Sequence, residues 1–177
     1  YTFTATAEIV RYLGADPLFV DIEGDSLNID PDKVKLSLET YGEKIKVIVP
    51  VHVAGCPCDM EALCSLGGKY GTSIVEDSSH AFPSNTKMGY LGTIGDVGVF
   101  SLYANKPITT GEGGMLVTDS EEIADRVAVM RLHGIDREVW GRYQSSKPKN
   151  NSWEYDIVEA GFKYNMSDIA AAIGRIQ

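Results

Sequence analysis

Short apolar runs and amphipathic stretches alternate along most of the chain. The apolar runs predict buried strands over residues 17–21, 45–51, 73–77, 97–102 and 115–118. Between several of them, apolar residues recur at helical spacing, which predicts helices over residues 5–13, from Asp30 to about Tyr41, and after Asp59. Strands that alternate with helices are typical of a parallel sheet whose connections cross over through the helices. The pattern therefore predicts an α/β fold.

Residues that favour helix starts mark several of these boundaries. The carboxylate of Asp30 can accept hydrogen bonds from the first free amides of the second helix. A further helix is predicted to start at Asp119, where Glu122 completes a pattern similar to a capping box. The final helix is predicted to be capped by Ser167 or Asp168.

The segment from Arg137 to Glu154 breaks the alternation. It is polar, with serine, lysine, proline and asparagine in succession, and it predicts a long loop. A loop of this length is unusual in a compact domain, which suggests a role in binding or at an interface.

Composition and charge exclude several classes of protein. The 177 residues are 44% hydrophobic and 23% charged, as in ordinary globular proteins. A formal net charge of −9, with the basic residues scattered, argues against nucleic-acid partners, which require clustered lysine and arginine. No apolar stretch approaches the length of a membrane span, and the opening residues lack the features of a secretory signal. We therefore expect neither a nucleic-acid nor a membrane partner.

Three cysteines, Cys56, Cys58 and Cys64, leave at least one thiol unpaired. The spacing of Cys56 and Cys58 matches neither a zinc site nor a thioredoxin-type pair, so no metal site is expected. Reduced thiols of this kind are typical of a cytoplasmic protein.

Three short motifs carry groups that could perform chemistry. They are Glu76-Asp77-Ser78-Ser79-His80 at the end of a predicted strand, Ser101 to Lys106 after another, and Gly111-Glu112-Gly113-Gly114. Each alone has a common structural explanation, because acidic pairs form turns, lysines are usually solvated and glycines mark turns. The motifs become informative when they are taken together.

Together, the motifs supply the three groups that an aldehyde cofactor with a pyridine ring and a phosphate requires. The amine of Lys106 can form a Schiff base with the aldehyde. The carboxylate of Asp77 can keep the pyridine nitrogen protonated, and the hydroxyl of Ser101 can bind the phosphate. His52 and His133 are expected to have structural roles.

Four successive stretches carry a resemblance to a known family. They are VPVHVAGCPCDMEALCSLGGKYG, VEDSSHAF, GDVGVFSLYANKPITTGEGGMLVTD and GFKYNMSDIAAAIGRIQ. In this order they resemble the DegT/DnrJ/EryC1/StrS family, which comprises fold-type-I sugar aminotransferases that use pyridoxal 5'-phosphate. The resemblance implies a three-layer α/β sandwich with a mostly parallel sheet. Residues 1–177 would then be part of the large, cofactor-binding domain.

The resemblance assigns roles to six residues. Lys106 matches the Schiff-base lysine, which also moves a proton between the amino-acid carbon and the cofactor's C4′, and Asp77 matches the partner of the pyridine nitrogen. His80 takes the position that contacts the cofactor's ring oxygen, and Ser101 that of the phosphate-binding serine. In the remaining positions, Phe3 aligns with an aromatic residue that stacks on the ring, and Asn165 with an asparagine that reaches the phosphate of the neighbouring subunit.

The family also implies a reaction and its partners. The expected activity is transfer of an amine from L-glutamate to a keto sugar on a nucleotide carrier, in a homodimer. The stretches HGIDREVWGRY and GFKYNMSDI are similar to the branch that makes 4-amino sugars.

The chain also departs from the family pattern. Family members are longer, so we expect an N-terminal segment and a C-terminal small domain to be missing, and the isolated piece to be inactive. Pro107 stands where asparagine is common, and it removes a backbone N–H next to Lys106.

Other functions remain open at this point. A non-catalytic regulatory protein, or an inactive fragment of the same fold, is the main alternative. A general metabolic aminotransferase is a second alternative, disfavoured by the order of the sugar-family stretches. Relatives that remove a hydroxyl group carry histidine at the lysine position, so Lys106 argues against that activity.

Overall fold

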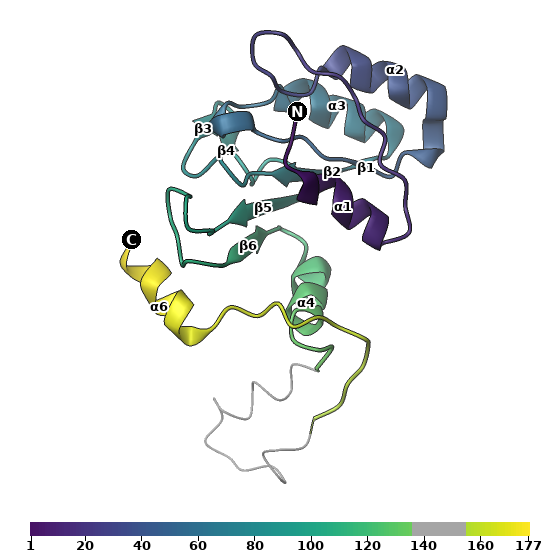
Figure 1. Ribbon diagram of the computed structural model, residues 1–177. Helices are drawn as coiled ribbons and strands as arrows, with labels where there is room; N and C mark the ends of the chain where they lie inside the picture. Colours follow the sequence, from purple (N-terminus) through teal and green to yellow (C-terminus); the bar gives the residue numbers. More distant parts are fainter. Residues whose placement is uncertain (136–154) are drawn as a thin grey trace. The chain divides into compact units, whose positions relative to one another are not determined.

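The computed structural model describes residues 1–135 and 155–177 (Figure 1). The chain divides into two compact units. The first unit contains residues 1–119 and 169–177, and the second contains residues 120–168. The predicted loop from Arg137 to Glu154 lies outside the described residues. No helix of the described ranges is long and apolar enough to cross a membrane.

A four-stranded sheet forms the centre of the first unit. Its strands are β1 (Val47–Ile48), β2 (Ser73–Asp77), β5 (Val97–Ser101) and β6 (Gly114–Val117), in the order β1-β2-β5-β6. The first three strands are parallel, and β6 is antiparallel to β5. This is the mostly parallel sheet that the alternation of strands and helices predicted.

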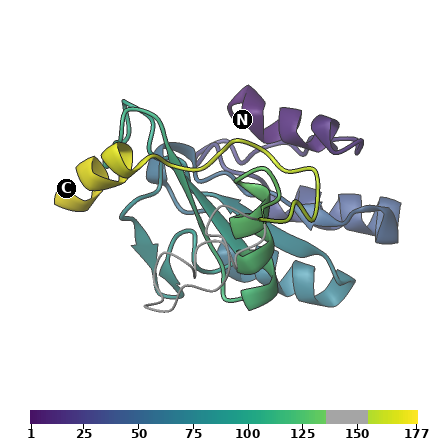
Figure 2. The same cartoon turned by 90° about the horizontal axis from the view of Figure 1, so that it is seen from below.

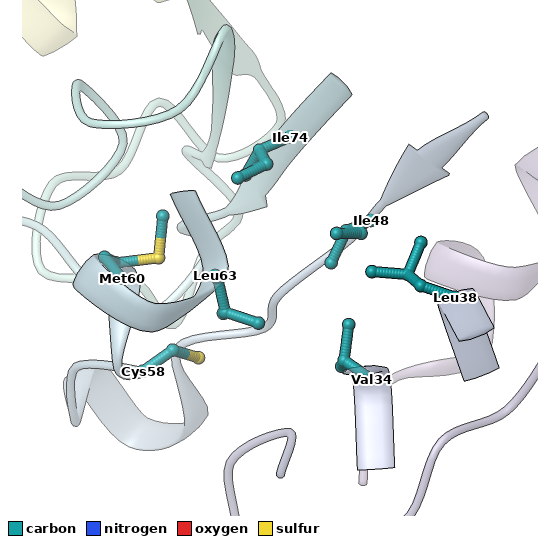
Figure 3. Packing of buried hydrophobic residues seen from close by; sticks show 7 residues of the cluster. All are labelled: Val34, Leu38, Ile48, Cys58, Met60, Leu63 and Ile74. Carbon is teal, nitrogen blue, oxygen red and sulfur yellow. The ribbon is translucent and has the colours of Figure 1, made fainter. Parts of the chain in front are cut away.

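Two helices cover one face of this sheet. They are α2 (Pro31–Tyr41) and α3 (Met60–Tyr70), and the second makes the crossover between β1 and β2. In Figure 3 the side chains of Val34 and Leu38 on α2 point toward Ile48 on β1. The buried cluster consists of Val34, Leu38, Ile48, Cys58, Met60, Leu63 and Ile74. Each buried leucine contributes roughly 1.5–3 kcal/mol to folding, so this cluster is what holds the helices on the sheet.

A third helix, α1 (Thr4–Tyr12), covers the opposite face. Successive residues of a strand point to opposite faces, so Ile74 and Asp77 project from opposite sides of β2. Ile74 lies in the core beneath α2 and α3, whereas Asp77 accepts a hydrogen bond from Thr6 of α1. Figure 2 shows α1 and α3 on either side of the strands. The unit therefore has the helix–sheet–helix layers expected from the family resemblance.

A fully buried carboxylate, Glu76, lies next to this core. One of its oxygens accepts hydrogen bonds from the amides of Ile94 at 2.7 Å and Gly95 at 2.6 Å. The other accepts from the amide of Gly92 at 2.8 Å and from Nε2 of His52 at 2.9 Å. Burial opposes ionisation, but the hydrogen bonds from His52 and the three amides outweigh it and hold the pKa of Glu76 below its ordinary value.

His52 is the structural histidine that was expected. It is fully buried, and its Nδ1 accepts a hydrogen bond from the amide of Cys58 at 3.2 Å. The ring proton must therefore sit on Nε2, which donates to Glu76. The pair ties the segment after β1 to the end of β2.

Gly98 allows the loop before β5 to approach the strand closely. A Cβ at Gly98 would overlap the carbonyl oxygen of Gly92, whose amide donates to Glu76. Only glycine therefore lets this loop run across β5 and bring its amides to the buried carboxylate.

The local predictions for the helices are largely confirmed. The side chain of Asp30 accepts hydrogen bonds from the amides of Asp32 and Lys33, as expected for the cap of α2. The fourth helix, α4 (Glu121–Met130), begins later than predicted, because Ser120 and not Asp119 caps it. The last helix, α6 (Asp168–Ile176), begins at Asp168, which leaves Ser167 in the capping position.

The predicted strand over residues 17–21 is wrong. Leu18 and Phe19 are 47% and 74% exposed, and the neighbouring Ile22 forms only an isolated bridge with Ile29. A strand exists only where another strand satisfies its backbone, and a short apolar run cannot show whether that partner is present.

The predicted strand over residues 45–51 is shortened to Val47–Ile48. Pro50 lacks an N–H group and cannot continue the ladder as a donor, although its carbonyl accepts from Asp77. The strands β5 and β6 match their predicted ranges to within one residue at each end.

Short elements complete the described chain. They are the 3-10 turns Gly42–Lys44 and Val53–Gly55 and the two-stranded ladder of β3 (Asn85–Thr86) and β4 (Gly89–Tyr90). The second unit contains α4, a bridge between Leu132 and Lys163, and an ion pair between Arg126 and Glu159.

The buried carboxylate generates a stability prediction. Glu76→Gln places an NH₂ group against backbone donors, so we expect a loss of about 3 kcal/mol at neutral pH. Because the folded-state pKa of Glu76 lies below the unfolded value, its contribution is complete above the unfolded pKa and is lost as the pH falls through the folded pKa. Urea unfolding followed by circular dichroism should therefore show the stabilities of the two proteins converging in acid.

Glu39→Gln is the matched control. Glu39 is exposed on α2, so the same substitution should change the free energy of unfolding by less than about 0.5 kcal/mol. Equal stability of Glu76→Gln and the unaltered protein at neutral pH would contradict the structural role of this carboxylate.

Candidate functional site

Two of the predicted site residues end neighbouring parallel strands. Asp77 is the last residue of β2, and Ser101 is the last residue of β5. Asp77 lies opposite Val99, so Ser101 is two residues further along the same strand. Opposite residues of a ladder share a face, as do residues two apart on one strand. Asp77 and Ser101 therefore project from the same face at the carboxyl edge of the sheet.

The carboxylate of Asp77 is held on both of its oxygens. The amide of Ser79 donates to Oδ1 at 3.1 Å, and the hydroxyl of Thr6 donates to Oδ2 at 2.7 Å. Its backbone is also fixed, because its amide donates to Pro50 and its carbonyl accepts from His52. The half-buried acid thus has a defined orientation at the strand end.

Lys106 lies in the connection between β5 and β6. Its amide donates to the carbonyl of Tyr103 at 3.0 Å, which closes a turn directly after β5. Ser101 borders the same turn, since its Oγ accepts from the amide of Tyr103 at 3.3 Å. The connection is closed at its base by Leu102, whose amide donates to Gly113 and whose carbonyl accepts from Thr110. The half-buried Lys106 is therefore placed beyond the same strand end as Ser101.

Lys106 and Asp77 make no ion pair with each other among the described residues. They come from the ends of adjacent strands, the amine from beyond β5 and the carboxylate from β2. The structure thus brings both groups to one edge of the sheet without direct contact between them.

Phe3 and His80 belong to two segments next to Asp77, the start of α1 and the turn after β2. Phe3 is 75% exposed and precedes α1, and its carbonyl accepts from the amide of Thr6, the residue that binds Asp77. His80 is exposed and lies in the turn that follows β2. The amide of Ala81 closes this turn by donating to the carbonyl of Ser78.

Asn165 belongs to the second unit. Its side-chain oxygen accepts a hydrogen bond from the amine of Lys163. The neighbouring rings of Phe162 and Tyr164 stack with centroids 4.9 Å apart. The role of Asn165 at a cofactor remains a prediction.

Two contributions to this region were missed in the sequence. Thr6 binds Asp77 across 71 residues of chain, and no local pattern signals such a contact. The sequence pattern gives Glu76 only the expected role of an acidic pair that forms a turn. Glu76 occupies the inward-facing position two residues after Ile74, and that alternation is the signal that could have identified a buried carboxylate.

The chain is also similar to known proteins over its whole length. The model of the DegT/DnrJ/EryC1/StrS aminotransferase family matches residues 1–177. The spore coat polysaccharide biosynthesis protein SpsC of Bacillus subtilis is 43% identical over 173 residues, which are 98% of this chain and 43% of SpsC. The chain thus spans less than half the length of this relative.

Solved structures show the same fold. PseC of Helicobacter pylori, an aminotransferase of pseudaminic acid biosynthesis, superposes with a TM-score of 0.85 at 31% identity, over 99% of this chain and 43% of PseC. Spr1654 of Streptococcus pneumoniae, solved in its pyridoxal phosphate form, superposes with a TM-score of 0.80 at 32% identity. The superposition covers 99% of this chain and 46% of Spr1654. DesI, solved with its TDP-sugar product, superposes with a TM-score of 0.80 at 30% identity, and the superposition covers 98% of this chain and 40% of DesI.

The match to the family model extends over every residue of the chain. The fold also superposes on that of the solved aminotransferase PseC over 99% of this chain. This chain belongs to the DegT/DnrJ/EryC1/StrS aminotransferase family.

Proposed function

We propose that the complete protein containing this chain transfers an amine from L-glutamate to a nucleotide-linked keto sugar, using pyridoxal 5'-phosphate. The observation that carries the proposal is the placement of three groups at one sheet edge. Asp77 and Ser101 share a face at the ends of adjacent parallel strands, and Lys106 follows in the next turn. Ligands of open α/β sheets bind at this edge.

The donor set fits the proposed cofactor. A carboxylate, an amine and a hydroxyl suit a pyridine nitrogen, an aldehyde and a phosphate, respectively. Ser101 accepts a hydrogen bond from Tyr103, so the proton of its hydroxyl can be donated to a phosphate oxygen. The absence of an ion pair between Lys106 and Asp77 in the described chain leaves each group available to the cofactor.

When bound, pyridoxal phosphate supplies an electron sink for the negative charge that develops at the amino-acid carbon. Lys106 would hold the aldehyde carbon and, when released, would move the proton between the amino-acid carbon and C4′. Asp77 would keep the ring nitrogen protonated.

The remaining predicted residues would orient the cofactor. His80 would contact the ring oxygen, Phe3 would stack on the ring, and Asn165 would reach the phosphate bound by a partner subunit in a homodimer. The exposed position of Phe3 leaves its ring free for such stacking.

The substrate class rests on the relatives. SpsC is named for polysaccharide biosynthesis, PseC for the biosynthesis of pseudaminic acid, and DesI was solved with a TDP-sugar product. These relatives favour a nucleotide-linked sugar as the amine acceptor and, with the reduced cysteines, a cytoplasmic enzyme.

The first test replaces the proposed attachment lysine in the full-length protein. Lys106→Ala should abolish the visible absorption band of lysine-bound pyridoxal phosphate and lower transamination by roughly 10²–10⁴-fold, since a proton-transfer group is lost. Lys35→Ala, at an exposed position of α2, should leave both unchanged. Persistence of the band in Lys106→Ala would rule out this lysine.

The second test concerns Asn165 and the dimer. Asn165→Ala should weaken cofactor binding, because the phosphate loses a hydrogen-bond donor from the partner subunit. When subunits of this variant are mixed and reassembled with Lys106→Ala subunits, about half of the dimers should be mixed and contain one intact site, which restores about a quarter of the native activity. A mixture no more active than its components would show that Asn165 does not act across a subunit interface.

A further inference from the structure

The hydroxyl of Thr6 has a defined donor direction. The Asp77 carboxylate can only accept, so the Thr6 hydroxyl proton points to Oδ2 over 2.7 Å. A hydroxyl has a single proton, so Thr2 must be the donor in its 2.8 Å contact with Thr6, and it shares that proton with a longer contact of 3.3 Å to the carbonyl of Phe3. The two hydroxyls thus form a short chain that ends on Asp77.

This contact is a specific link between α1 and the sheet. No residue of α1 is fully buried, and the half-buried residues of the helix are Thr6, Ala7 and Val10. With so little apolar burial, this side-chain hydrogen bond is a directional contact that favours one rotation of α1 over Asp77.

Threonine is not favoured at this position by the helix itself. Thr6 lies inside the first turn of α1 and not at the cap, which is Phe3. Alanine is a better residue for a helix interior. Helix propensity therefore does not favour a hydroxyl here, and the Thr6 hydroxyl has two partners, Thr2 within the same segment and the Asp77 carboxylate across the fold.

Phe3 is the N-cap of α1 and Thr6 lies three residues later in the first turn, so the two residues are close together at the start of the helix. The amide of Thr6 also donates to the carbonyl of Phe3 at 3.3 Å. A hydroxyl that anchors Thr6 to Asp77 therefore also sets where the helix start, and the Phe3 ring with it, lies relative to the carboxylate.

We propose that Thr6 is a positioning residue for the cofactor. Its hydroxyl would hold Asp77 in an orientation suited to the pyridine nitrogen and would keep the start of α1, with Phe3, next to that carboxylate. The inference rests on the proposed function, because it assigns Thr6 to the same site. Ser79 orients the other oxygen from the backbone, so Thr6 supplies the side-chain contact that substitution can remove.

The experiment uses the full-length protein with pyridoxal phosphate as the probe. Thr6→Val removes the hydroxyl and keeps the shape, Thr6→Ala removes it and favours the helix, and Thr6→Ser restores it. Thr4→Val is the matched control, because Thr4 is exposed on the same helix and its hydroxyl binds Glu8. Asp77→Asn serves as the reference for loss of the carboxylate.

The readouts are the dissociation constant of the cofactor and its visible circular dichroism, which reports the orientation of the bound ring. Losing one hydrogen bond to a charged group should raise the dissociation constant about tenfold in Thr6→Val and Thr6→Ala. The dichroic band should change in the same two variants. Thr6→Ser should stay within about twofold of the unaltered protein, and Thr4→Val should be unchanged.

The outcomes separate this inference from the proposed function. If Asp77→Asn weakens binding while Thr6→Val and Thr6→Ala behave like Thr4→Val, the role of Thr6 is overturned and the proposed function stands. If neither Asp77→Asn nor Lys106→Ala alters the cofactor spectrum, the proposed function itself fails. If Thr6→Val and Thr6→Ala both fail to fold while Thr6→Ser folds, the hydroxyl serves folding and the positioning role is also overturned.

Discussion

The burial of the Glu76 carboxylate is the interaction on which the arrangement of the first unit depends. A charge removed from water is costly unless hydrogen bonds replace its hydration. Glu76 receives four, from His52 after β1 and from the three amides of Gly92, Ile94 and Gly95 before β5. These donors bind the flanking segments of both neighbouring strands to the end of β2, so the strand end cannot shift without exposing an unpaired carboxylate.

Asp77 follows Glu76 at the end of β2, so the same hydrogen bonds also fix its position. The pleat of β2 turns Asp77 to the opposite face, where α1 and the end of β5 meet it. Two adjacent carboxylates therefore have different roles because of geometry alone: one is enclosed and structural, and the other is half-buried and available for binding. Ser101, at the end of β5, and Lys106, in the turn after it, lie at the same edge of the sheet as that carboxylate.

Elements encoded by neighbouring residues could be predicted well. The cap of α2 at Asp30 and the start of α3 after Asp59 depend on side chains within a few residues of the amides that they bind. The apolar run of β2 was also located correctly. The prediction of a strand over residues 17–21 was wrong because it depended on a distant part of the chain. A strand requires a partner strand, and a short apolar run does not show whether one is present.

The sequence by itself determined most of the helices and sheet strands, the mostly parallel α/β class and the family, since local periodicity, capping and motif order are all contained in consecutive residues. It also singled out Asp77, Ser101 and Lys106 as chemically capable groups. Only the tertiary structure decided that Thr6 binds Asp77 from 71 residues away and that Glu76 is enclosed by His52 and distant amides. Such contacts form when the chain closes long loops around a core, and the energy that selects them comes from burial, which no single segment possesses.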